Sequence, residues 1–358
     1  MSLPMPTSSA PLTTATPSRL RRVANLACAC VVALVTWEVC ARLDDVVTAG
    51  APFFGPYDNS VLYTSDALGM RGRPHARYLK WHLNSLGYRG PELPERGVRV
   101  VCLGSSETFG LYETADQEYP RQLEARLNQR AGEGAYAVLN AAYPGMSMLT
   151  SGRRLPELLD RVKPQIVVIY PSFTGYIEPP DPKAVPRPPK PSRLPRIAAR
   201  METVLRAALP ERLQAAVRRW QIEREARHLQ VMERLPEENV ARFRVDLEAV
   251  VDMVRARGGR VVLVTHATRF GARVAPEEES VLVAWRKFYP VLAPGGFLDM
   301  EERMNAVVRD VSKERGLGLA DAARRMPTGG RYFAEFVHFT DEGASRLAEL
   351  VAEAVLGR

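Results

Sequence analysis

The amino-acid sequence predicts an α/β fold in which a parallel sheet lies between two layers of helices. Short apolar runs rich in valine and isoleucine alternate with longer amphipathic segments, as in parallel strands joined by helices. One such run stops at Gly104 in a polar turn and the chain then resumes as a helix, which is typical of a strand-to-helix connection. The chain has 358 residues, of which 46% are hydrophobic, so it can bury a large core.

Hydrophobic periodicity places the elements of this sheet in order along the chain. The expected strands are 98–103, 136–140, 165–170, 260–266 and 317–320. The expected helices are 117–131, 151–162, 237–257, 299–315 and a last helix after Asp341. The carboxyl ends of parallel strands share one edge of the sheet, where such folds place their functional groups. The residues that directly follow each strand are therefore the candidates for a site.

The N-terminal segment predicts a membrane anchor. Residues 1–22 are rich in proline, serine and threonine and are expected to be disordered and cytoplasmic. No charged residue occurs from Val23 to Trp37, and continuing to Leu43 reaches the length of about 20 residues that a transmembrane helix needs. The arginines just ahead of this run predict that its first end faces the cytoplasm and that the rest of the chain lies outside it.

Two alternatives to this anchor remain open. A cleaved signal peptide has an apolar run of similar length, but no A-x-A site closes the run in this chain. A buried helix of a soluble protein is disfavoured by the arginine-rich flank. We therefore expect a single-pass signal anchor over 23–43 in the inner (cytoplasmic) membrane, with the following domain extracytoplasmic, in the periplasm.

Changes in composition divide the remaining chain. Residues 44–97 are punctuated by glycine and proline and are expected to wrap around the domain as turns. The α/β domain is expected in two parts, 98–178 and 237–358. The insertion between them, 179–236, begins as a proline-rich tether and continues as basic helices broken at Pro210. We expect a helical cap there; the alternative is a lid, or a surface that rests on anionic lipid or polymer.

The distribution of charge argues against a nucleic-acid-binding protein, and the cysteines argue against a disulfide-stabilised or CxxC metal-binding one. The formal net charge is +8, but the segment from Asp181 to Arg234 has thirteen Lys or Arg against six Asp or Glu and so carries most of the excess. A local basic insertion without a nucleic-acid-binding motif predicts no nucleic-acid partner. The four cysteines form neither a disulfide framework nor a CxxC metal knuckle.

Ser106 is the candidate nucleophile. It lies in the stretch VVCLGSSETFGLYE, Val100 to Glu113, where a buried strand ends in a glycine turn and a helix begins. Such a turn places the side chain at the edge of the sheet, close to the N–H groups of the helix N-terminus. A serine at its ordinary pKa is a poor nucleophile and needs a base and an orienting acid.

The chain has only five histidines from which to choose that base. His338 lies just before the last helix, and Glu335 precedes it by three residues. This spacing can put a carboxylate beside the imidazole and so set its tautomer, while the other ring nitrogen faces the serine. His266 ends an expected strand and is the competitor inside the domain. The other three lie in the wrapping segment and the insertion, where surface or packing roles are expected.

Three blocks in this order resemble the SGNH (GDSL-type) hydrolase superfamily, in a membrane-anchored bacterial branch. Gly104, Ser105 and Ser106 stand where the first block usually has Gly-Asp-Ser. The stretch NAAYPGMS, Asn140 to Ser147, resembles the second block. The stretch EFVHFTDEG resembles the last block, with Glu335 in place of the usual aspartate. Apart from the insertion, the resemblance covers roughly residues 98 to 356.

The resemblance implies the three-layer α/β/α, flavodoxin-like fold and acyl transfer without a metal or organic cofactor. Ser106 would attack an ester carbonyl, His338 would take and return the proton, and Glu335 would steady the imidazolium. The oxyanion hole would use the N–H groups of Ser106 and Gly145. Thr174 falls where the family usually has an oxyanion-hole asparagine, and losing one such donor commonly costs about 100- to 1000-fold in rate.

Three functions follow from this resemblance. We expect a membrane-anchored, extracytoplasmic serine esterase that hydrolyses O-acyl esters, for example acetyl esters, of a polysaccharide or a small molecule. The same residues would serve a polysaccharide O-acyltransferase, in which a sugar hydroxyl replaces water and a membrane-bound O-acyltransferase is the partner. Thr174 favours a third alternative, a degenerate protein that binds carbohydrate or a partner. Serines that only cap a helix, with Glu335 and His338 on a surface loop, are the non-catalytic interpretation of the same residues.

Overall fold

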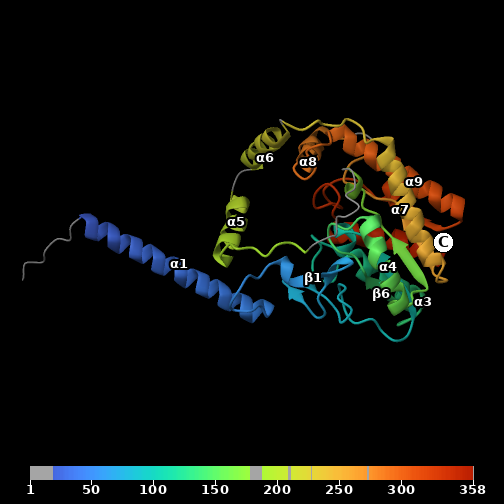
Figure 1. Ribbon diagram of the computed structural model, residues 1–358, viewed down its shortest axis with the longest axis horizontal. Coiled ribbons are helices and arrows are strands. Elements are labelled where there is room, and N and C mark those ends of the chain that lie inside the picture. Colours follow the sequence, from blue (N-terminus) through green and yellow to red (C-terminus); the bar gives the residue numbers. More distant parts are fainter. Residues whose placement is uncertain (1–18, 178–187, 209–210, 227, 272–273, 358) are drawn as a thin grey trace, which may run out of the picture. The chain divides into compact units, whose positions relative to one another are not determined.

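The structure is a computed structural model that describes residues 19–177, 188–208, 211–226, 228–271 and 274–357 (Figure 1). Its contacts divide the chain into two compact units. One unit contains the residues up to Pro56 together with Arg193–Thr203, and the other contains Tyr57–Ser192 and Val204–Arg358. Residues 1–18, most of the expected tether (178–187) and Pro210 lie outside the described residues.

Helix α1 (Arg19–Ala49) dominates the first unit. Its most apolar 18-residue window has a mean hydropathy of 1.9 and is not buried at all, so α1 is long and apolar enough to cross a membrane. A signal sequence would pass the same test. The helix includes the arginines at 19, 21 and 22, which the sequence placed ahead of it, and continues six residues beyond Leu43.

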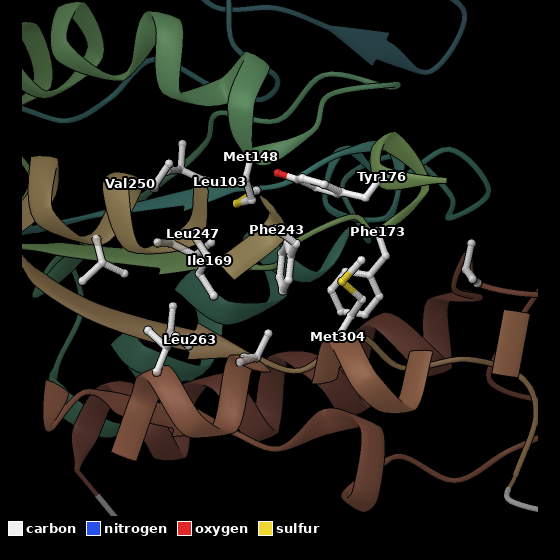
Figure 2. Close-up of a cluster of buried hydrophobic side chains, with 14 of the residues drawn as sticks. Leu103, Met148, Ile169, Phe173, Tyr176, Phe243, Leu247, Val250, Leu263 and Met304 are labelled. Carbon is white, nitrogen blue, oxygen red and sulfur yellow. The ribbon is translucent and has the colours of Figure 1, made fainter. Parts of the chain in front are cut away.

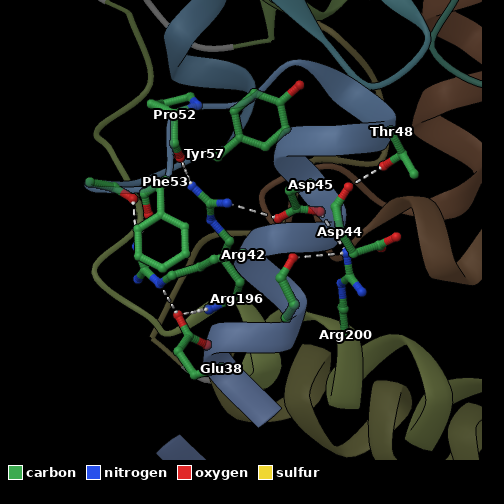
Figure 3. A network of polar contacts seen from close by, with 12 residues as sticks. Glu38, Arg42, Asp44, Asp45, Thr48, Pro52, Phe53, Tyr57, Arg196 and Arg200 are labelled. Atoms are coloured by element: carbon green, nitrogen blue, oxygen red, sulfur yellow. Dashed lines mark hydrogen bonds and ion pairs between the residues drawn. The ribbon is translucent and has the colours of Figure 1, made fainter. Parts of the chain in front are cut away.

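Polar contacts join the last part of α1 to the start of helix α5 (Arg196–Ala208), as Figure 3 shows. Glu38 accepts hydrogen bonds from Arg42 Nε at 2.7 Å and from the backbone N–H of Ile197 at 3.0 Å. Arg200 pairs with Asp44 at 2.8 Å and with Asp45 at 2.6 Å. The charged residues in the C-terminal part of α1 therefore begin at Glu38, directly after the apolar run.

The second unit contains a five-stranded parallel sheet, which confirms the predicted fold class. The strands, in spatial order, are β6 (Tyr136–Asn140), β5 (Val98–Leu103), β7 (Ile166–Ile169), β8 (Arg260–Val264) and β9 (Gly318–Ala320). Cys102 on β5 pairs with Asn140 on β6 and with Val168 on β7, so these strands end close together. Most side chains in the strands are buried, which explains why the strands read as runs of valine and isoleucine.

Helices cover both faces of this sheet. Along β5, Val101 and Leu103 belong to one buried cluster, whereas Val100 and Cys102 belong to the other. The first cluster, shown in Figure 2, packs the sheet against α4 (Met148–Val162), α7 (Glu237–Arg255) and α9 (Pro294–Arg315). The second cluster packs it against α3 (Tyr119–Ala131) and α11 (Asp341–Leu356). The result is the expected three-layer α/β/α arrangement.

Short elements account for most differences from the sequence prediction. The wrapping segment contains a 3-10 turn, η1 (Asn59–Leu62), and two hairpins, β1 (Tyr63–Asp66) with β2 (Gly69–Gly72) and β3 (Arg77–Tyr78) with β4 (Trp81–His82). These strands have two to four residues, too few for a periodicity to be read. Other short elements are α2 (Ser106–Phe109), η2 (Thr174–Tyr176), η3 (Pro276–Glu278), α8 (Glu279–Trp285) and α10 (Ala322–Arg325). In the described part of the insertion, α6 (Glu211–Ala226) follows α5.

Candidate active site

The carboxyl edge of the sheet gathers residues that lie far apart in the sequence. Ser106 follows β5, and the loops that carry Gly145 and Thr174 follow the two strands beside it, β6 and β7. His266 follows β8, and His338 lies just before α11. The sheet topology thus places four of these five residues after neighbouring strands, as Ser106 and its expected oxyanion donors require.

A tight turn presents Ser106 at the first position of α2. A Cβ atom on Gly104 would lie 2.0 Å from Thr108 Oγ1, so only glycine fits this turn. Asn140 Nδ2 donates to the carbonyl of Thr108 at 2.9 Å and ties α2 to the end of β6. The half-buried Ser106 side chain has its Oγ 3.3 Å from Glu107 Oε2. Its backbone N–H belongs to the first helical turn, where no intrahelical acceptor exists.

Glu335 orients the imidazole of His338. One carboxylate oxygen, Oε1, bonds to His338 Nδ1 and also accepts the backbone N–H of His338 at 3.1 Å. The side chains of His338 and Glu335 are 14% and 20% exposed. The other ring nitrogen, Nε2, is buried and has no hydrogen-bond partner among the described residues. The expected acid and base are therefore in contact, and the base keeps one nitrogen available.

The surroundings of His338 favour its protonated form. Burial alone lowers its pKa, but the hydrogen bond to Glu335 and the negative charges of Glu107, Glu335 and Glu113 outweigh burial and raise the pKa. In the described residues, Ser106 and His338 are not joined by a hydrogen bond. Catalytic hydrogen bonds are often long in the absence of substrate, so this separation does not exclude a nucleophile and its base.

Two of the three expected oxyanion donors, Gly145 and Thr174, have hydrogen-bond partners within the protein. Gly145 has a φ of +81°, a conformation that favours glycine, and its N–H donates to Ser105 Oγ at 3.1 Å. This contact puts the Gly145 N–H beside the Ser105–Ser106 turn. Thr174 Oγ1 lies 3.2 Å from Ser172 Oγ, so its hydroxyl also has a partner. The role of these groups as oxyanion donors stays a prediction.

His266, the competing candidate for the base, lies between two carboxylates. Its Nδ1 lies 2.8 Å from Glu301 Oε2, and its Nε2 lies 3.4 Å from Glu107 Oε1. Because carboxylates occupy both ring nitrogens, His266 is not available as the base for Ser106. Sequence reasoning missed both of these glutamates. The only sequence signal was that Glu107 directly follows the candidate nucleophile.

A second group of ionisable residues missed from the sequence lies near His338. Glu113 is 1% exposed, and burial raises its pKa to about 7 although the charges of Arg89 and His338 act in the opposite direction. Arg89, from the wrapping segment, pairs with Glu118 at 2.9 Å, and both side chains are 2% exposed. Arg89 Nη1 also donates to the Gly110 carbonyl at 2.6 Å and thereby fixes the loop that follows α2.

No group of three or more His, Cys, Asp or Glu residues in the described part of the chain is arranged to hold a metal ion. The residues that the structure gathers at the sheet edge are a serine, an acid–base pair and backbone N–H groups. This set can perform nucleophilic attack on a carbonyl with proton transfer.

Comparisons with known proteins give matches among solved structures only. No family model and no curated protein matches the chain. TesA is 17% identical, with 72% of this chain and 97% of TesA covered and a TM-score of 0.42. A lipase/acylhydrolase from Enterococcus faecalis is 16% identical, with 73% and 96% covered and a TM-score of 0.45. A mutant of Axe2, an acetyl-xylooligosaccharide esterase from Geobacillus, is 13% identical, with 74% and 96% covered and a TM-score of 0.43.

Proposed function

We propose that this chain is a serine ester hydrolase of the SGNH type, anchored in the membrane by α1, and that Ser106, His338 and Glu335 are its catalytic triad. One observation carries the proposal. The imidazole of His338 is held by Glu335 through Nδ1, while its buried Nε2 has no described partner at the sheet edge where Ser106 begins a helix. A structural histidine would satisfy both nitrogens, as His266 does.

The reaction then proceeds by two acyl transfers. Ser106 Oγ attacks the ester carbonyl, and His338 Nε2 takes the hydroxyl proton as the new C–O bond forms. His338 gives this proton to the leaving alcohol as the old C–O bond breaks. Water next attacks the acyl-serine, again losing a proton to His338, which returns it to Ser106. Glu335 stabilises the imidazolium in both steps.

Stabilisation of the oxyanion needs a rearrangement of Ser105. The backbone N–H of Ser106 is the first donor. The Gly145 N–H becomes the second once the Ser105 hydroxyl, which accepts it at 3.1 Å, turns away from it. The hydroxyl of Thr174 is the third donor, with a shorter reach than an asparagine amide. These donors support a working hydrolase that is slower than one with a complete hole.

The anchor and its orientation are supported by α1. Its apolar part is exposed, its first turns carry three arginines, and the polar contacts of Glu38 mark where the apolar part ends. Positive charge at the first end favours a cytoplasmic N-terminus, which puts the catalytic unit on the extracytoplasmic side. The substrate class is then an O-acyl ester, such as an acetyl ester of an envelope polysaccharide or of a small molecule.

Hydrolysis of p-nitrophenyl acetate by the full chain in detergent tests the proposal. We expect activity that is lost in Ser106→Ala and in His338→Ala but kept in His228→Ala, a control at an exposed histidine of the insertion. A folded parent chain without activity above background, or a Ser106→Ala variant with full activity, would contradict it. Adding a sugar acceptor to the assay distinguishes hydrolysis from transfer, because an acyltransferase would acylate the sugar.

A further inference from the structure

Three buried ionisable side chains contact one another in a row that begins next to Ser106. The Glu107 carboxylate is 3.3 Å from Ser106 Oγ through Oε2 and 3.4 Å from His266 Nε2 through Oε1. His266 Nδ1 is in turn 2.8 Å from Glu301 Oε2. The side chains of Glu107, His266 and Glu301 are 4%, 2% and 8% exposed. These groups come from α2, from the end of β8 and from α9, and the triad mechanism uses none of them.

The imidazole of His266 is held in one orientation between the two glutamates. Its backbone N–H donates to Asn305 Oδ1 at 2.7 Å, and Asn305 Nδ2 donates back to the His266 carbonyl at 2.8 Å. The rings of Tyr170 and Phe173 pack 5.2 Å and 5.0 Å from it. Burial raises the pKa of Tyr170 well above its usual range, so this neighbour is neutral. His266 therefore keeps both of its nitrogens directed at the two carboxylates.

Hydrogen-bond chemistry sets the number of protons that these three side chains share. Two nitrogen–oxygen contacts need one proton each, because a bare nitrogen facing a carboxylate would be repulsive. The three side chains therefore hold two protons and carry one net negative charge, whether the second proton rests on His266 or on Glu301. Burial raises the pKa of Glu301. Its Oε1 has no described hydrogen-bond partner that would stabilise a negative charge, which is consistent with a proton shared between Glu301 and His266.

The negative charge resides on Glu107. Burial alone would raise its pKa, but the hydrogen bond from His266 and the charges of His338 and His266 outweigh burial and lower the pKa to about 2. Burial alone would lower the pKa of His266. The charge of Glu301 and the hydrogen bond to Glu107 outweigh burial and raise this pKa to about 10. Glu107 is thus the anionic member of the three.

We propose that Glu107, His266 and Glu301 form a positioning network that holds one negative charge beside Ser106 and makes His338 a stronger base. The consequence for His338 rests on the proposed function, whereas the network and its charge do not. A nearby negative charge stabilises imidazolium over neutral imidazole. The network would therefore raise the pH at which the His338 imidazolium loses its proton and would move the acid limb of the reaction to higher pH.

Several groups face His338, and the test has to separate them. Glu335 lies on its own loop, Glu107 comes from α2, and Glu113 comes from the loop after α2. The ring of Tyr112 lies 5.3 Å away, and burial raises the pKa of this phenol. Of these groups, only Glu107 belongs to the network. Glu113→Gln is therefore the matched control, since it removes a different buried carboxylate that acts on His338.

Histidine NMR of the full chain in detergent tests the proposal without any reaction. With five histidines, selective isotope labelling and single His→Gln variants assign every ring. We expect His338 to titrate above the usual value of about 6.5. Glu107→Gln should lower this midpoint, because the negative charge of Glu107 is one of the interactions that raise the pKa of His338. Glu107→Asp, which keeps the charge, should restore most of the shift.

The control variants separate the network from general effects. Glu301→Gln should make the His266 ring lose its second proton at lower pH, and Glu113→Gln should leave the His266 ring unchanged. A folded Glu107→Gln chain in which His338 titrates as in the parent would overturn the proposal. If that variant does not fold, the parent chain decides, because an ordinary His338 midpoint near 6.5 would overturn it as well.

Activity and NMR together distinguish the two proposals. In an active chain, the acid limb of kcat/KM should move to lower pH in Glu107→Gln by the same amount as the His338 midpoint. A parent chain without esterase activity but with the expected NMR shifts would refute the proposed function and support the network. If the chain is active but Glu107→Gln changes neither the acid limb of kcat/KM nor the His338 midpoint, the function would be supported and the network refuted.

Discussion

Glu335 Oε1 binds both the ring Nδ1 and the backbone N–H of His338, three residues further along the same loop. The same oxygen lies 3.4 Å from the backbone N–H of Val337. These contacts curl the loop around the carboxylate, so the glutamate arm folds back to reach the imidazole. The acid and the base predicted from the sequence are therefore in contact.

Replacing this carboxylate should remove most activity while leaving the fold intact. Glu335→Gln keeps the shape but cannot stabilise an imidazolium, so we expect kcat to fall by about 100- to 10,000-fold. Hydrolysis of p-nitrophenyl acetate measures the effect. The control is Glu342→Gln, which removes an exposed ion pair with Arg331 and should leave kcat unchanged. Equal activity in Glu335→Gln and the parent would show that the carboxylate is not part of the machinery.

Introducing an amide at position 174 should raise the rate. An asparagine reaches further than the Thr174 hydroxyl, which is paired with Ser172 at 3.2 Å. We expect Thr174→Asn to raise kcat by about 10-fold or more, given that one oxyanion donor is commonly worth about 100- to 1000-fold. Thr174→Val, which has no donor, should lower kcat with little change in KM. A drop in kcat for Thr174→Asn would mean that the loop after β7 does not face the oxyanion.

The buried pair of Arg89 and Glu118 should matter far more for stability than an exposed one. Breaking a buried pair leaves an uncompensated charge, so Glu118→Gln should lower the free energy of unfolding by about 3–5 kcal/mol. Asp160→Asn breaks the exposed pair with Arg257 and should have no measurable effect. Thermal unfolding of both variants checks this contrast. Similar Tm values for the two would argue against a buried charge at Arg89.

Glu113 should make stability decrease as the pH rises. Burial raises its pKa from the usual 4.5 to about 7, so the folded chain binds a proton that the unfolded chain has already lost in this window. Its contribution is full below pH 4.5 and is lost as the pH rises through 7. Glu113→Gln lacks this loss, and its Tm relative to the parent should therefore be higher at pH 8 than at pH 5. A Tm difference that does not change with pH would contradict the buried, protonated carboxyl.

The sequence predicted the elements that repeat one physical pattern over enough residues. The strands from Val98 to Leu103 and from Tyr136 to Asn140 were predicted with the bounds they have, because side chains buried on both faces of a sheet must be apolar. Glu335 and His338 were predicted as a pair because they lie three residues apart on one loop. The hairpins between Tyr63 and His82 could not be predicted, since their strands are too short to show a period.

By itself the sequence determined the sheet, its helices, the apolar helix α1 and the residues expected in the triad. Only the tertiary structure decided the state of the ionisable groups around them. Glu107 reads as an ordinary acid in the first turn of a helix, where acids are common and solvated. It is buried where His266, 159 residues away and just after β8, contacts it, and α9 in turn brings Glu301 against the other nitrogen of His266. The charge of a carboxyl depends on its neighbours in space and on its burial, which hydrophobic periodicity does not record.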